Sequence, residues 1–164
     1  MKKLIFAILI TLTIFLFSIN NADALEINYL DKALISSNTE IFDDGSYLIT
    51  NVYEYNPQVS ALSTTKTKTG EIKKEFYNKD TIEWTYILSA TYELVEGVSV
   101  TCTSSDYSYS ISKSQWKFSD GNSYYENNVA HGKGTFKYKV FGFITSTTIN
   151  LDVTLTCDVY GNLS

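Results

Sequence analysis

Apolar and polar residues alternate along most of the chain after residue 80. In residues 82–94 every even position is apolar, whereas most of the odd positions are polar. Successive side chains of a β-strand point to opposite faces, so this period of two predicts a strand with one buried face, not a helix. The apolar positions of this strand are Ile82, Trp84, Tyr86, Leu88, Ala90, Tyr92 and Leu94.

The same alternation recurs elsewhere in the chain. It predicts further strands over residues 98–102, 135–140 and 147–157, and a turn-led strand over roughly 46–55. The odd positions of the last strand, from Ile149 onward, form its apolar face. These strands together predict at least one extensive sheet with a buried side.

The segment SSDYSYSISKSQW, residues 104–116, alternates aromatic residues with serine. Tyr107, Tyr109 and Ile111 share one face of the predicted strand, and serines share the other. This phase indicates that the rings, and Trp116 after them, cover the core. The alternative is an aromatic platform that holds the rings out for a glycan or a protein partner.

Turn-forming residues separate the predicted strands. Glycine, aspartate and asparagine tolerate left-handed backbone or bond back onto the chain. Strands at short spacing without a convincing helix predict an all-β fold, an antiparallel sandwich or barrel, of which we favour the β-sandwich. The turn segments are Asp43-Asp44-Gly45-Ser46, Glu96-Gly97, Asp120-Gly121-Asn122 and Gly142.

The N-terminus has the features of a secretory signal peptide. Lys2 and Lys3 precede an uncharged apolar run over 4–19, and Ala22 and Ala24 supply the small residues of a cleavage site. An uncleaved membrane anchor is the alternative, but the polar break before the alanines favours cleavage. No later apolar run reaches the roughly 20 residues that a membrane-spanning helix needs. We therefore predict a secreted, extracellular protein without membrane insertion after cleavage.

Three segments follow from these observations. Residues 1–24 are the predicted signal peptide, 25–45 a poorly structured segment with at most one helical turn, and 46–164 a single β-sandwich domain. The Ser-, Thr- and Lys-rich stretch 59–69 is predicted to be an edge strand or a linker, because lysines suit an exposed edge.

The two cysteines predict one disulfide. Cys102 and Cys157 continue the apolar faces of different strands, and disulfides persist outside the cell. Together with Trp116 they imitate the spacing of immunoglobulin domains, but Leu155 stands where those domains have a tyrosine. We therefore expect an immunoglobulin-like architecture at most.

The charge of the chain argues against nucleic-acid binding. The net charge is −5 and the sequence contains no arginine. Nucleic-acid-binding proteins show basic patches that neutralise phosphates, and arginine forks that read bases. An acidic chain is also a poor electrostatic match for anionic lipid.

From Asp44 onward the chain resembles a family of small secreted proteins from Firmicutes. The resemblance covers about three quarters of the chain and implies secretion, but no particular activity. The segments that carry it are DGSYLIT, TTKTKTGEIKKEFYN, EWTYILSATYELVEG, VTCTSSDYSYSISKSQW, NNVAHGKGTFKYKV and VTLTCDVYGNLS.

The residue pattern lacks the constellations that enzymes use. His131 is the sole histidine, and no Gly-x-Ser-x-Gly elbow accompanies it, so neither a triad nor a zinc site is indicated. The run Asp43-Asp44-Gly45 lacks the spacing of a calcium loop and reads as a turn. We predict no catalytic residues, no metal and no cofactor.

These observations favour a binding or interaction module whose partner is an unknown glycan or protein. The candidate contacts are Tyr124 and Tyr125, which follow a predicted turn and of which at least one should face solvent. A structural component of the envelope or matrix, assembled through edge strands, and a bacteriocin-like secreted factor are the alternatives.

Overall fold

The computed structural model describes residues 32–55, 64–141 and 144–164, and the predicted signal peptide and Gly142 lie outside them. All regular structure in these ranges is β-strand. The eight strands are β1 (Lys32–Ile41), β2 (Tyr47–Tyr55), β3 (Lys66–Asn78), β4 (Thr81–Val95), β5 (Ser99–Ile111), β6 (Trp116–Glu126), β7 (Val129–Val140) and β8 (Ile144–Thr156).

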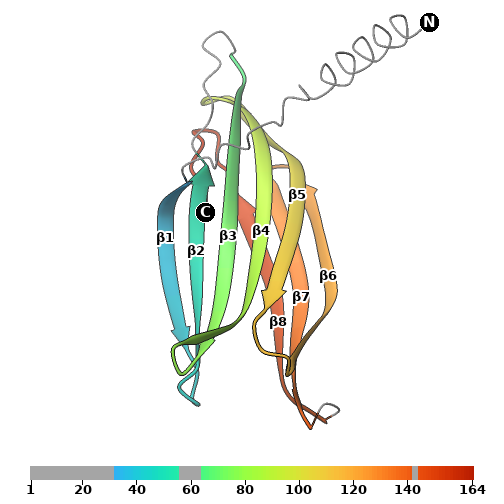
Figure 1. Ribbon diagram of the computed structural model, residues 1–164. Coiled ribbons are helices and arrows are strands. Elements are labelled where there is room, and N and C mark those ends of the chain that lie inside the picture. The colour runs from blue at the N-terminus through green and yellow to red at the C-terminus, as the bar shows by residue number, and fades with distance from the viewer. Residues whose placement is uncertain (1–31, 56–63, 142–143) are drawn as a thin grey trace, which may run out of the picture. The chain divides into compact units, whose positions relative to one another are not determined.

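The strands form two antiparallel sheets in which each strand pairs with its neighbours in the chain (Figure 1). The five-stranded sheet has the order β1-β2-β3-β4-β5, and the three-stranded sheet has the order β6-β7-β8. The three-stranded sheet approaches β3, β4 and β5 most closely, Leu48 and Val52 of β2 also belong to the core, and β1 is exposed along its length. This arrangement confirms the predicted all-β, antiparallel β-sandwich.

The inward face of β4 is the centre of the core. Its even positions from Trp84 to Leu94 are all buried, as the alternation predicts. The Trp84 ring lies parallel to Phe76 of β3, with centroids 5.3 Å apart, and to Phe136 of β7 in the other sheet, at 3.9 Å. Parallel rings at these distances add to the burial of apolar area, so this stack joins the two sheets.

Glycines in β7 make room for these large side chains. A Cβ atom on Gly132 would lie 2.6 Å from the Tyr86 hydroxyl, and one on Gly134 would lie 2.4 Å from the Phe118 ring. Any other residue at these positions would force the rings to move, because no carbon atom tolerates such contacts. The small residues of β7 thus complement the aromatic residues of β4 and β6.

The strand β4 departs from strict alternation at Glu83. Ile82 pairs with Tyr77 and Trp84 with Phe76, so Glu83 is an extra residue in a bulge. Its carboxylate is buried and accepts a hydrogen bond from Nε1 of Trp116 at 2.5 Å. A polar residue that the alternation places outside therefore serves the core, because the bulge turns it inward.

Three sequence expectations need correction. Residues 25–45 were expected to be poorly structured, but Lys32–Ile41 form strand β1, paired along its length with β2. The segment 120–122 is no turn after a strand: it is an irregularity inside β6, where Asp120 has a φ of 58°. The described part of 59–69 contributes to β3, which lies between two strands and is not an edge.

The C-terminal residues fold back on the end of β8. Cys157 forms a bridge with Leu163, and the backbones of Thr156 and Ser164 exchange two hydrogen bonds. Leu163 is buried against Gly70, where a Cβ atom would lie 2.4 Å from its side chain. This short return closes one end of the core.

Among the described residues, no helix is long and apolar enough to cross a membrane.

The buried tyrosines predict a loss of stability at alkaline pH. Burial raises the pKa of Tyr86 to about 12, and burial and then the neighbouring thiols raise that of Tyr92 above its usual value. As the pH rises, both phenols remain protonated in the folded protein at pH values at which they are already ionised in the unfolded chain. Their contribution to stability is therefore present below about pH 10 and is lost as pH rises through the folded pKa, by about 1.4 kcal/mol per pH unit for each group.

Denaturant unfolding at a series of alkaline pH values measures this loss. The variant Tyr86→Phe keeps the ring and should show a shallower decline than the wild type. Ionisation of all tyrosines of the folded protein at their ordinary pKa, seen in ultraviolet absorbance, would contradict the expectation.

Candidate functional site

The outward face of β2 and β3 carries an ordered set of tyrosines and charged residues. Inward positions such as Val52 and Ile72 serve the core, so the intervening residues point away from it. We call this set the tyrosine–carboxylate face. Its members are Tyr47, Tyr53 and Tyr55 of β2, Glu71, Lys73, Glu75 and Tyr77 of β3, and Lys32 of β1.

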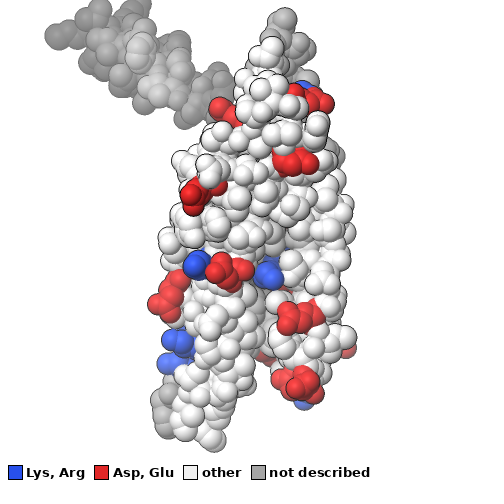
Figure 2. Space-filling view, turned by 180° about the vertical axis from the view of Figure 1, so that it is seen from behind, with Lys and Arg blue, Asp and Glu red and all other residues white. Residues whose placement is uncertain are grey.

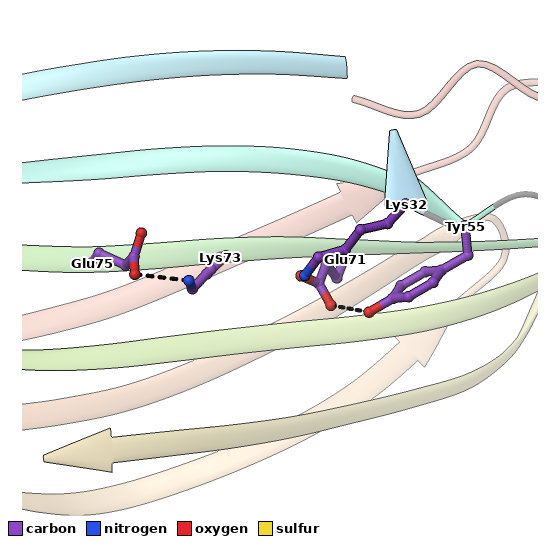
Figure 3. Close-up of polar contacts among 5 residues, drawn as sticks. All are labelled: Lys32, Tyr55, Glu71, Lys73 and Glu75. Carbon is purple, nitrogen blue, oxygen red and sulfur yellow. Dashed lines mark hydrogen bonds and ion pairs between the residues drawn. The ribbon is translucent and has the colours of Figure 1, made fainter. Parts of the chain in front are cut away.

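Glu71 is the most enclosed residue of this face, with 3% of its surface exposed. One carboxylate oxygen lies 2.6 Å from Nζ of Lys32, and the other accepts a hydrogen bond from the Tyr55 hydroxyl (Figure 3). Nζ of Lys32 also lies 4.5 Å from the ring centroid of Tyr53, within cation–π range. Three strands thus contribute to one fixed arrangement around a single carboxylate.

A second ion pair lies farther along β3. Lys73 and Glu75 are two residues apart on the same face, and their charged atoms are 2.7 Å apart (Figure 3). Beyond Glu75, the rings of Tyr47 and Tyr77 stack with centroids 4.9 Å apart and planes 6° apart. This cross-strand stack closes one end of the face, and the cluster around Glu71 closes the other.

Burial and charge together decide the protonation of this face. Burial, and then the hydrogen bond to Glu71, raise the pKa of Tyr55, so its phenol remains a donor. Burial alone would lower the pKa of Lys73, but the hydrogen bond and charge of Glu75 outweigh it and raise the value. Each of the two lysines of the face lies beside one of its two glutamates, so the opposite charges are paired.

This arrangement provides groups that molecular recognition commonly uses. The face offers rigid rings and oriented carboxylate oxygens, which accept hydrogen bonds. Within the described ranges, no three His, Cys, Asp or Glu side chains come together as ligands for a metal ion.

The structure places the predicted contacts Tyr124 and Tyr125 in strand β6, not on a loop. Both face solvent, with 42% and 50% of their surface exposed. The Tyr124 ring stacks on the ring of His131 in β7, with centroids 4.6 Å and planes 7° apart. Exposed Tyr124 and half-buried His131 therefore form a stacked aromatic pair on the three-stranded sheet, separate from the tyrosine–carboxylate face.

Charged residues accompany this pair on the three-stranded sheet. In the next row Lys133 lies opposite Asp152, with their charged atoms 3.4 Å apart, and farther along the sheet Lys117 lies opposite Lys137. Figure 2 shows the molecule from behind, where charged side chains of both signs are scattered among uncharged ones.

The prediction that the rings of residues 104–116 cover the core is confirmed for some of them but not for all. Tyr107 and Ile111 pack against the core, and Trp116 is buried. Tyr109 remains 49% exposed, although its ring stacks on Phe118 with centroids 4.0 Å apart. Tyr109 lies on β5 at the margin of the five-stranded sheet, so one side of its ring lacks cover.

The predicted disulfide between Cys102 and Cys157 is absent. Both residues are buried free thiols, and their sulfur atoms are not at disulfide distance. Each thiol is directed to nearby backbone: Cys102 donates to the carbonyl of Ser104 at 3.2 Å, and Cys157 to that of Asp158 at 3.5 Å. Alternation correctly placed both on inward faces, but shared burial does not bring two sulfur atoms into bonding geometry.

The tyrosine–carboxylate face was not predicted from the sequence. The signal was present in residues 47–55, where the even positions Leu48 and Val52 are apolar and three odd positions are tyrosines. A strand with apolar residues on one side and aromatic residues on the other can form apolar contacts on both of its faces. Partners such as Lys32 and Glu71 are 39 residues apart in the chain, so no local pattern shows their contact.

Comparisons with family models, curated proteins and solved structures found no match to this chain.

We expect both thiols to be unreactive in the folded protein. Burial raises the pKa of Cys102 above its usual value and that of Cys157 to about 11, so little thiolate forms at neutral pH. An aromatic disulfide reagent should therefore react slowly with the native protein and rapidly with two thiols after denaturation. A mass two hydrogens lower, with no thiol released on unfolding, would instead indicate a bond.

We expect Tyr55→Phe to destabilise the fold by about 1–3 kcal/mol, because Glu71 loses a donor while remaining enclosed. Denaturant unfolding followed by tryptophan fluorescence measures this change. The double variant Tyr55→Phe, Glu71→Gln serves as the control, since it also removes the charge that the hydroxyl satisfies. Equal stability of wild type and Tyr55→Phe would show that this hydrogen bond contributes nothing.

Proposed function

We propose that this protein is a secreted, non-enzymatic binding module whose tyrosine–carboxylate face binds an uncharged glycan. The observation that carries the proposal is the enclosure of Glu71 on an outward face, held by Lys32 and Tyr55 from two other strands. A core needs no such ordering on its outer side. An ordered polar cluster among aromatic rings is typical of a recognition surface, where fixed side chains lower the entropic cost of binding.

The pairing of charges favours a neutral ligand. Both glutamates of the face already have a lysine partner, so covering them leaves no isolated charge in a dry interface. A carboxylate has lone pairs for more than two donors, and sugar hydroxyls are such donors. The tyrosine rings supply apolar area beside them.

Secretion enters this proposal from the sequence alone. The basic, apolar and small-residue succession over residues 1–24 and the resemblance to small secreted Firmicutes proteins support an extracellular role. Glycans of cell walls and host surfaces are abundant in that compartment. A module without net positive charge would bind them through rings and hydroxyl contacts instead of through phosphate groups.

The stacked pair of Tyr124 and His131 provides a second candidate contact surface. It offers two aligned rings on the three-stranded sheet. Carboxylates held in place by partners, as around Glu71, are not part of it. We therefore rank it after the tyrosine–carboxylate face.

A glycan array with matched variants tests the proposal. Glu75→Gln keeps the size of the side chain but leaves Lys73 without its partner charge, and Tyr53→Ala removes a ring from the opposite end of the face. Each should weaken binding of a neutral glycan by about tenfold or more, in line with the loss of a hydrogen bond to a charged group.

The double variant Tyr124→Ala, Tyr125→Ala is the control and should bind as the wild type does. Loss of binding only in this control would move the site to the three-stranded sheet. A wild-type protein that binds none of the glycans but captures a protein would refute the assignment of the ligand class.

A further inference from the structure

Strand β1 is an open edge of the five-stranded sheet. It occupies one end of the strand order and pairs only with β2 among the described strands (Figure 1). All ten of its residues are exposed. They include three large apolar side chains, namely Leu34, Ile35 and Ile41, which are 56%, 45% and 76% exposed.

Most features that protect natural edge strands are missing from β1. An edge presents unpaired backbone N–H and C=O groups, and proline, charges or bulges normally block a second strand from pairing there. The strand KALISSNTEI contains no proline. Its lysine, Lys32, is turned onto Glu71 and Tyr53, and the other charge of the strand, Glu40, lies within electrostatic reach of Lys74 in β3. One bulge, between Leu34 and Ser36, is the remaining feature that could hinder pairing with another strand.

The side chains of β1 match their own copies in one antiparallel register. Ile41 lies opposite Tyr47 on the outward face of the sheet, and Ser36 lies opposite Val52 on the inward face. Ile35 is the extra residue of the bulge, next to Leu34, which lies opposite Tyr53 on the outward face that Ile41 shares. In antiparallel pairing about a two-fold axis at Asn38, residues equally far before and after Asn38 lie opposite each other. Ile35 of each copy, three residues before the axis, therefore faces Ile41 of the other copy, three residues after it.

This register also avoids every conflict of charge. It sets Asn38 opposite Asn38, where two amides can exchange hydrogen bonds, and Glu40 opposite Ser36. An axis at Glu40 would oppose two carboxylates, and an axis at Thr39 would set Ile41 opposite Ser37. The match of apolar to apolar side chains without a pair of like charges favours the axis at Asn38.

We infer that β1 pairs with β1 of a second copy of this chain, antiparallel and about a two-fold axis at Asn38, and so joins two five-stranded sheets into one continuous sheet. Such an interface is isologous and closes with two copies. It satisfies the backbone groups of both edges and buries two Ile35–Ile41 contacts. This inference does not depend on the proposed glycan site.

Charge-exchange variants at Asn38 test both the dimer and its register. The full chain, in the form that the producing cell yields, is studied by sedimentation over a range of concentrations. The wild type should dimerise with rising concentration. Asn38→Lys and Asn38→Asp should each weaken dimerisation several-fold, because like charges meet at the axis, and an equimolar mixture of the two should restore it.

Ile41→Ser removes one contact in each half of the interface and should weaken dimerisation at least tenfold. Thr148→Lys and Thr148→Asp are the matched controls, since Thr148 is exposed on β8 at the edge of the other sheet. Tryptophan fluorescence confirms that each variant is folded, because Trp84 and Trp116 are buried.

Three outcomes would overturn the inference. The wild type could remain monomeric at the highest concentration, or its dimers could be indifferent to every change at Asn38. Growth into larger assemblies that only the Thr148 variants disrupt would assign the contact to β8 and to an open, heterologous arrangement. Binding of an unrelated protein strand by a monomer would likewise refute pairing between copies.

Discussion

The stack of Trp84 between Phe76 and Phe136 is the contact on which the rest of the structure depends. It spans both sheets, and all three rings are almost entirely buried. Beside this stack, Gly132 and Gly134 of β7 leave space for the side chains of Tyr86 and Phe118, with which a Cβ atom would collide. The position of the three-stranded sheet over β3, β4 and β5 follows from this match of large and small side chains, because interiors are packed without voids.

The packing of the core also determines which residues of β2 and β3 face outward. Since alternate residues of β2 and β3 are committed to the core, the residues between them form an outer face with its own order. Glu71 is buried on this face and is held by fixed partners, unlike a freely solvated surface residue. The partners are needed because burying a carboxylate without them would cost free energy. The surface proposed to bind a ligand is in this sense a consequence of the core.

The unequal width of the two sheets has a further consequence. Three strands cannot cover five, so β1, whose residues are all exposed, extends beyond the core and ends as an open edge. The face proposed for a glycan and the edge proposed for a second copy therefore belong to the same part of the sheet. Lys32 links them, because its place on Glu71 orders the face and also removes a charge from the edge.

The sequence by itself determined the class of fold and the inward residues of the later strands. A period of two is a local property, and it correctly placed Trp84, Leu151 and both cysteines inside. Only the tertiary structure decided which strands are neighbours, and hence the contact of Lys32 with Glu71, the bulge at Glu83 and the separation of the two sulfur atoms. These features depend on register between strands distant in the chain, and alternation within one strand carries no information about register.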